Sequence, residues 1–186
     1  MNNKTVKPIL IIAVMLAAAS TRLFPHVLNF TPITAIALFG AALLPNNWMK
    51  FTLPLAVIFL SDCLLQLQNG TGFYQGMGVV YFAYSIMLVW GMYMTKKLTF
   101  PTVLFASLGS SVLFFLITNF ALFYSDSAVL NPALAGITNP LARIMASYTA
   151  AIPFFRNSLS GDLLFSGILF GGYFAVTKIV KSFKLA

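Results

Sequence analysis

Long apolar runs, separated by short gaps that hold most of the lysines, constrain this sequence more than any motif does. Of its 186 residues, 60% are hydrophobic and 8% are charged. Soluble domains contain about 45–50% apolar residues, and a helix needs about 20 of them to cross a bilayer. The sequence therefore predicts a single polytopic transmembrane domain over residues 1–186, with no room for a soluble domain.

The apolar runs predict an all-α bundle of six transmembrane helices. Alanines and Gly40 make the second run slim enough to lie inside the bundle. Residues 141–155 are only mildly amphipathic, which predicts a re-entrant or surface-lying helix. The first run resembles a signal peptide but continues through Phe24, so we expect it to remain as a span. The predicted spans are residues 8–21, 31–44, 51–67, 77–95, 102–124 and 162–178.

With six spans the gaps alternate between the two sides of the membrane, and the charges divide unevenly between them. One side receives all eight lysines and the other receives all three arginines. Cytoplasmic loops of membrane proteins are enriched in basic residues. We therefore expect a multi-pass protein of the bacterial inner membrane with both termini in the cytoplasm. The net charge of +8 then reflects orientation in the lipid bilayer, and no nucleic-acid partner is expected.

Other polar side chains fall on the side opposite the lysines. The richest stretch, Tyr148–Asp162, places aromatic rings, an arginine, an asparagine and an aspartate before the last span. Polar groups at membrane depth are costly and commonly mark a pathway or a binding site. We therefore expect an outward-opening pocket for a small-molecule solute. The candidate substrate-binding residues are Asn29, Asp62, Asn119, Phe155, Arg156, Asn157 and Asp162.

Several of these candidates also have a structural interpretation. Asp62 could pair with Arg156 as a buried brace. Asp162 could occupy the first turn of the last span, where the helix dipole favours an acid. Asn119 could hydrogen-bond a neighbouring helix, and Phe155 could belong to an aromatic belt at the membrane surface. The sequence leaves these alternatives open.

Three further features can each be interpreted in more than one way. Ala13 and Ala17 form a small-residue stripe on the first span, which could dock a partner subunit or pack inside the protein. The polar loop over residues 66–74 could cover a ligand or form an ordinary turn. Arg22 and Arg143 are expected to meet lipid headgroups.

The sequence lacks the parts of several active sites. Cys63 is the single cysteine and His26 the single histidine, which excludes an intramolecular disulfide and multi-histidine metal sites. The phosphate-loop, zinc-protease and serine-hydrolase motifs are absent. We therefore expect no enzyme, no catalytic residue, no cofactor and no bound metal. An aspartyl pair would require the carboxyls of Asp62 and Asp162 to meet.

Four segments resemble an uncharacterised bacterial family of transport-type proteins (DUF6580-like), and the likeness covers nearly the whole chain. That family is similar to the substrate-binding S components of energy-coupling factor (ECF) transporters. The resemblance implies a six-helix component that binds a vitamin-like solute and docks on separate ECF transmembrane and ATPase subunits. The segments are Arg22–Ile33, Ser61–Asp62, Thr118–Phe120 and Ala151–Asp162.

The main alternative is an ion-coupled secondary transporter or channel. Asp62 would then be the proton or cation site, because a low-dielectric wall disfavours its ionised form. A structural or assembly role is a further alternative, and it predicts no cavity behind the Tyr148–Asp162 stretch.

Overall fold

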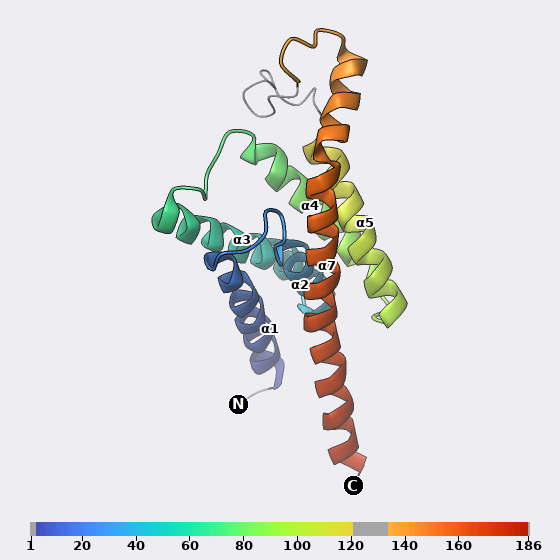
Figure 1. Cartoon of the computed structure of the whole chain (residues 1–186). Helices are drawn as coiled ribbons and strands as arrows, with labels where there is room; N and C mark the ends of the chain where they lie inside the picture. Colours follow the sequence, from blue (N-terminus) through green and yellow to red (C-terminus); the bar gives the residue numbers. More distant parts are fainter. Residues whose placement is uncertain (1–2, 121–133, 186) are drawn as a thin grey trace.

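The computed structural model describes residues 3–120 and 134–185, with side chains for residues 7–120 and 134–180. This part of the chain forms six α-helices and one 3-10 turn and contains no strand, so the all-α prediction is confirmed (Figure 1). The elements are α1 (Asn3–Ser20), η1 (Thr21–Leu23), α2 (Ile33–Leu43), α3 (Asn47–Asn69), α4 (Met77–Met94), α5 (Phe100–Thr118) and α7 (Pro140–Leu185).

Four of the described helices are long and apolar enough to cross a membrane, namely α3, α4, α5 and the Pro140–Val180 part of α7. Helix α2 has 11 residues and rises only about 17 Å at 1.5 Å per residue, less than the roughly 30 Å of a hydrocarbon core. Each predicted span thus falls on a helix, but the first, α1, is not among these four, and the second is too short to cross alone. The number of six spans therefore stays a prediction. The predicted end of the fifth span, residues 121–124, lies outside the described residues.

Helix α2 forms the centre of the bundle. All of its residues except Ala42 are buried, and it contacts α1, α3, α4, α5 and α7. The close approach of α3 depends on Gly40, because a Cβ atom there would lie 2.4 Å from Cγ of Pro54. The prediction that small residues let this segment lie inside the bundle is confirmed.

The long helix α7 replaces two predicted elements. The sequence predicted a re-entrant or surface-lying helix over residues 141–155 and a separate last span starting at Asp162, but one helix of 46 residues runs from Pro140 to Leu185. Pro153 lies inside it. A membrane helix tolerates proline where neighbouring helices and hydroxyl side chains satisfy the freed backbone groups, and α7 packs against both α5 and α2. Its N-terminal end extends beyond the other helices (Figure 1).

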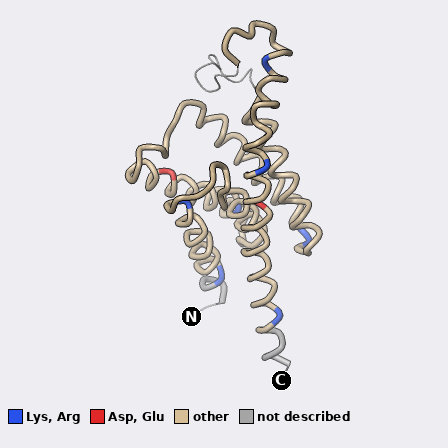
Figure 2. The backbone as a smooth tube through the Cα atoms, in the orientation of Figure 1, with Lys and Arg blue, Asp and Glu red and all other residues tan. Residues whose placement is uncertain are grey.

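Both chain termini and the turn between α4 and α5 lie at one end of the molecule (Figure 1). Basic residues mark both chain ends and that turn (Figure 2). Lys7, Lys96 and Lys178 belong to these segments. Their grouping at one end agrees with the charge pattern of the sequence, and the orientation of that end in a membrane stays a prediction.

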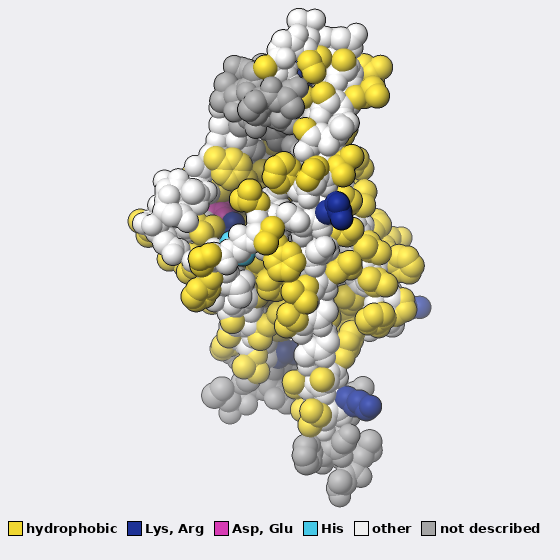
Figure 3. Space-filling model, viewed as in Figure 1, with side chains coloured by type: hydrophobic (Ala, Val, Ile, Leu, Met, Phe, Trp, Pro, Cys, Tyr) yellow, Lys and Arg dark blue, Asp and Glu magenta, His cyan; other side chains and the backbone are white. Residues whose placement is uncertain are grey.

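Much of the outer surface is apolar (Figure 3). Such a surface is rare on soluble monomers but is what lipid tails require. Exposed large side chains occur on several helices and include Leu10, Phe59, Phe82, Phe105 and Ile168. Together with the long apolar helices, this surface is that of a multi-pass membrane protein.

Candidate functional site

A pocket of about 530 Å³ lies between α4, α5 and the N-terminal half of α7. Three connections complete it: the first contributes Asn29, the second Tyr74, Gln75 and Gly76, and the third Leu134. Its volume lies within the roughly 300–1,000 Å³ of small-molecule sites. The remaining lining residues are Val80, Ser111, Phe114, Phe115, Thr118, Asn119, Ser147, Ala150, Ala151, Phe154, Phe155 and Ser158.

The connection that carries Asn29 is fixed against α7. A Cβ atom on Gly161 would lie 3.1 Å from the backbone nitrogen of Thr31, so only glycine lets the two segments come so close without a shift. The side-chain amide of Asn157 donates to the carbonyl of Leu28 at 3.1 Å. Asn29 itself has a φ of 63°, a conformation that asparagine adopts more readily than most residues. Asn157 therefore positions Asn29 and does not line the pocket.

Aromatic and hydroxyl contacts join α5 to α7 around the pocket. The rings of Phe115 and Phe155 lie 4.7 Å apart between centroids. The Tyr148 hydroxyl donates to the carbonyl of Leu116 at 2.8 Å. Phe155 is half-buried and lines the pocket, so its ring does more than face the membrane surface.

Asn119 ends α5 at the pocket. Its side-chain amide donates to the carbonyl of Phe115 at 2.9 Å, within its own helix. Its backbone carbonyl accepts a hydrogen bond from Ser147 of α7 at 2.8 Å. The side-chain bond to a neighbouring helix that the sequence suggested is thus replaced by a backbone contact.

Asp162 lies in the middle of α7, so its predicted place in the first turn of a helix is wrong. The residue is buried, with an exposed fraction of 5%. The Ser111 hydroxyl donates to its Oδ2 at 2.5 Å, and Thr34 is a second hydrogen-bond partner. Because Ser111 lines the pocket, the carboxylate lies one hydroxyl group behind the wall.

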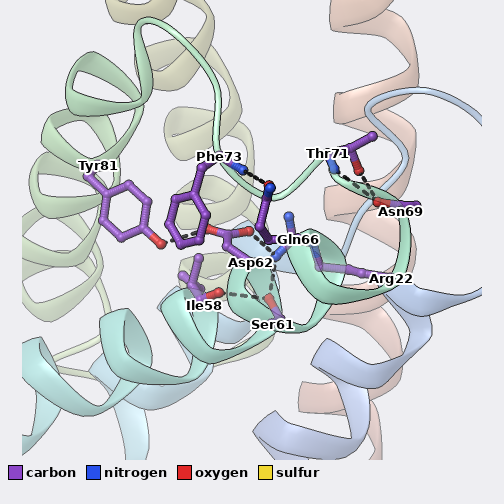
Figure 4. Close-up of polar contacts among 9 residues, drawn as sticks. All are labelled: Arg22, Ile58, Ser61, Asp62, Gln66, Asn69, Thr71, Phe73 and Tyr81. Atoms are coloured by element: carbon purple, nitrogen blue, oxygen red, sulfur yellow. Dashed lines mark hydrogen bonds and ion pairs between the residues drawn. The ribbon is translucent and has the colours of Figure 1, made fainter.

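Asp62 is held in a different way, by an ion pair (Figure 4). Its Oδ1 lies 2.7 Å from Nη1 of Arg22, with side-chain exposures of 5% and 11%. The Tyr81 hydroxyl donates to its Oδ2 at 2.6 Å. Arg22 also donates to the Ser61 hydroxyl, which in turn donates to the carbonyl of Ile58 at 2.8 Å. Asp62 is therefore neutralised inside the protein.

This ion pair corrects two predictions. The partner of Asp62 is Arg22 and not Arg156, which is exposed on α7. Arg22 likewise does not reach lipid headgroups, because η1 turns the chain directly after α1 and contacts α3. An ion pair inside a bundle satisfies both charges where a lipid-facing arginine would leave Asp62 unpaired.

The connection between α3 and α4 covers the Asp62 end of α3. A Cβ atom on Gly72 would lie 1.9 Å from the backbone oxygen of Asp62, so glycine permits the contact. The backbone N–H of Phe73 donates to the side-chain oxygen of Gln66 at 3.0 Å (Figure 4). The next residues, starting with Tyr74, line the pocket. The loop that was predicted either to cover a ligand or to form a turn thus forms one side of the pocket.

Contacts between aromatic rings connect the Asp62 ion pair to the pocket. The ring centroids of Tyr81 and Tyr84 lie 5.5 Å apart. Tyr84 in turn stacks on Phe114 at 5.4 Å with an interplanar angle of 9°. Since Phe114 lines the pocket, two ring contacts separate its wall from the residue that bonds Asp62.

The pocket includes only part of the predicted site. Asn29, Asn119 and Phe155 line it, whereas the other four candidates do not. A hollow shared by Asp62, Asn119 and Arg156 is therefore not formed, because Asp62 is paired under its loop and Arg156 points to the exposed side of α7. The substrate-binding role of each candidate stays a prediction.

The sequence analysis missed several lining residues. Ser111 is one of two adjacent serines within an apolar span, which was a usable signal. Tyr74 lies in the loop that was considered as a ligand cover, and Gln75 follows it directly. Ser158 lies within the Tyr148–Asp162 stretch but was not singled out there. Ser147 carries no local signal, because a serine in an amphipathic segment is ordinary. These residues line the same pocket.

Two candidate features lie away from the pocket. Ala13 and Ala17 are exposed, while Ile11 and Met15 form the face of α1 that packs in the core. The interpretation that the alanine stripe packs inside this protein is therefore wrong. Its use as a docking surface stays a prediction.

The acidic residues do not assemble into a metal or aspartyl site. Within the described residues, no three His, Cys, Asp or Glu side chains come together in a way that could hold a metal ion. Asp62 bonds Arg22 and Tyr81, whereas Asp162 bonds Ser111. The two carboxylates thus use separate partners on separate helices.

A family of unknown function, DUF6580, matches residues 2–183. No curated protein and no solved structure matches the chain. Because the match spans almost every residue, including all the helices described above, the chain belongs to the DUF6580 family.

Proposed function

We propose that this protein is the substrate-binding membrane component of an uptake system for a small organic, vitamin-like solute. The observation that carries the proposal is the pocket, which is lined by amides, hydroxyls and aromatic rings. It lies between the connections that follow α1, α3 and α5, away from the chain ends and their lysines. A mixed apolar and hydrogen-bonding cavity of this size is typical of small-molecule sites.

The proposed orientation follows from the basic residues. Lysines concentrate in the segments at the end that holds both termini. If this end faces the cytoplasm, as the enrichment of basic residues in cytoplasmic loops favours, the pocket opens toward the outside of the inner membrane. The solute can then bind in the pocket from the outside, before any energy-consuming step takes place.

The proposed energy source is a separate module with transmembrane and ATPase subunits, which is what a resemblance to ECF S components would imply. In this proposal the chain performs no catalytic step. The exposed stripe of Ala13 and Ala17 offers a surface where a partner helix can approach closely. It lies on α1, whose opposite face packs in the core, so docking there does not require the bundle to open.

The solute-binding part of the proposal is tested by mass spectrometry of small molecules retained on the purified protein. Ala150→Trp fills the pocket from α7, because Ala150 lines it. Ile168→Trp is the matched control, since Ile168 lies on the exposed face of the same helix, with an exposed fraction of 58%. We expect one compound to be retained by the natural protein and the control and to be lost in Ala150→Trp. Retention by all three proteins, or by none, would contradict the proposal.

The docking part is tested by co-purification with ATPase subunits. Ala13→Leu should reduce co-purification and leave solute retention intact, because the larger side chain blocks close helix approach. Val14→Leu, at an exposed neighbouring position, is the control. Equal co-purification of both variants would count against the docking role.

An ion-coupled transporter is the second candidate. Asp62 is a poor ion site because Arg22 already neutralises it. The observation that favours this candidate is Asp162, a buried carboxylate bonded by hydroxyl groups. Uptake into liposomes that contain this chain alone, driven by a sodium or proton gradient, would favour ion coupling over the ATPase module.

A further inference from the structure

We infer that the solute carries a positive charge and that Asp162 selects it. This inference rests on the proposed function, because it concerns the charge of the molecule that occupies the same pocket. It follows from which charged groups surround the pocket and which of them remain without a counter-charge.

The pocket offers no basic group to an anionic solute. None of its lining residues is Lys, Arg or His. The guanidinium of Arg22 is engaged by Asp62. Neither Arg143 nor Arg156 belongs to the lining, although other residues of α7 do. Residues 121–133, whose structure is not described, contain Asp126 and no basic residue. A carboxylate or phosphate in the pocket would therefore lose its hydration without gaining a cation.

Within the described residues, none of the elements packed around Asp162 supplies it with a basic partner. Helices α2 and α5, which pack against α7, contain no titratable side chain. The connection against Gly161 contributes Phe30 and Thr31, and its histidine, His26, is exposed and bonded to the carbonyl of Phe24. On α7 the nearest basic residue in sequence is the exposed Arg156. Within the described residues, the carboxylate has hydroxyl partners and no ion pair.

A cation in the pocket would supply the missing counter-charge. Ser111 forms both the wall of the pocket and the hydrogen bond to Asp162, so a positive group against this hydroxyl lies close to the carboxylate. Attraction between charges is much stronger at the low effective dielectric of a buried site than in water. An ionisable residue inside a membrane bundle commonly marks a substrate or ion pathway.

The aromatic lining fits the same charge. Phe114, Phe115, Phe154, Phe155 and Tyr74 all contribute to the wall. Aromatic faces attract organic cations, and the attraction is larger when the cation is desolvated. The inferred solute is therefore an organic cation, such as a ring with a quaternary nitrogen, and not a carboxylate or a phosphate ester.

The test uses three probes that share one ring and differ in charge. These are 1-methylnicotinamide, nicotinamide and nicotinate, which are cationic, neutral and anionic at neutral pH. An equimolar mixture is dialysed against the purified protein, and pocket-specific retention is the amount bound beyond that in Ala150→Trp. We expect the cation to exceed the neutral probe by about tenfold, with no retention of the anion.

Variants at position 162 assign this preference. Asp162→Asn should lower cation retention to that of the neutral probe, and Asp162→Glu, which keeps the charge, should preserve the preference. A preference that persists in Asp162→Asn, an anion retained as well as the cation, or no specific retention of the cation would overturn the inference. The ranking in the natural protein decides the sign of the charge even if Asp162→Asn does not fold.

The two proposals can fail separately. If the natural protein retains a neutral or anionic native compound that Ala150→Trp loses, the proposed function holds and the cation inference is wrong. If Ala150→Trp retains the native compound as well as the natural protein does, the pocket is not the site and both proposals fall.

Discussion

The two buried aspartates of the bundle are handled in opposite ways. Asp62, with an exposed fraction of 4%, is paired with Arg22 and bonded by Tyr81. Asp162, at 5%, is bonded by Ser111 and faces no basic group in the described residues. Both sites remove a carboxylate from solvent, but only the first provides a counter-charge.

This difference is the basis for assigning a structural role to Asp62 and for proposing a solute-binding role for Asp162. A buried ion pair holds its elements together, because losing either partner leaves a charge stranded. Asp62 thus ties the connection after α1 to α3. An acid without a counter-charge beside a pocket gains no ion pair that would stabilise the fold, which is why we propose that it binds the solute. Both residues were candidate substrate-binding residues in the sequence, and their partners in the structure distinguish them.

The largest effect is expected from Arg22→Ala, which breaks the ion pair and leaves Asp62 buried. Removing one partner of a buried pair costs about 3–5 kcal/mol of unfolding free energy. The measurement is the unfolding midpoint of the detergent-solubilised protein. Arg156→Ala, at an exposed position, is the control and should change stability by less than about 0.5 kcal/mol.

A double variant sharpens this result. Arg22→Met combined with Asp62→Leu removes both charges and should recover most of the loss, since apolar replacements of buried pairs are often neutral or stabilising. If Arg22→Ala and Arg156→Ala prove equally mild, Asp62 is not held by an ion pair and the contrast between the two acids disappears.

Gly72→Ala tests whether the connection between α3 and α4 covers Asp62. The added Cβ would lie 1.9 Å from the Asp62 backbone oxygen, so the loop must shift, at about 1–3 kcal/mol for an overpacked contact. Gly78→Ala is the control, because no atom lies within 4 Å of its Cβ position. The same unfolding measurement applies to both, and an unchanged midpoint for Gly72→Ala would mean that the loop does not seal this site.

Ser111→Ala tests the hydroxyl between the pocket and Asp162. Loss of this donor should cost about 1–2 kcal/mol, because a buried acceptor loses a partner, while Thr34 remains beside the carboxylate. Cation preference in the probe assay should persist, since the charge stays. Ser160→Ala, at an exposed position on α7, is the control. A larger loss than that of Arg22→Ala would reverse the assignment of the two acids.

The smallest effect is expected from Tyr81→Phe. The variant removes the 2.6 Å hydrogen bond to Asp62 but leaves the ion pair with Arg22, so the cost should be about 1 kcal/mol. Tyr93→Phe, an exposed tyrosine on the same helix, should have no measurable effect. A loss comparable to that of Arg22→Ala would show that the tyrosine, and not the arginine, holds this carboxylate in place.

The sequence predicted more of the fold than of the site. Hydropathy located the six α-helices of the described residues, and the small residues around Gly40 identified the one that lies at the centre. These features are local, because helix formation and lipid solubility depend on residues that are close in sequence. The continuous α7 was missed, since Pro153 breaks helices in water but is tolerated where other helices pack around it.

The candidate site was only partly predictable. Amide and aromatic residues such as Asn29, Asn119 and Phe155 were found because polar groups are rare in so apolar a chain. The partner of Asp62 was not predicted, since the chain has three arginines and their distance in sequence does not determine which one lies beside Asp62. The serines on α7 appear ordinary until this helix packs against α5.

The sequence by itself determined that this chain is a helical membrane protein with its lysines gathered at one end, because composition and charge order act along the chain. Tertiary structure alone decided that Arg22 neutralises Asp62 and that Asp162 lies behind the pocket without a basic partner in the described residues. The physical reason is that electrostatic neutralisation acts over a few ångströms in space, and only helix packing brings residues from distant segments within that range.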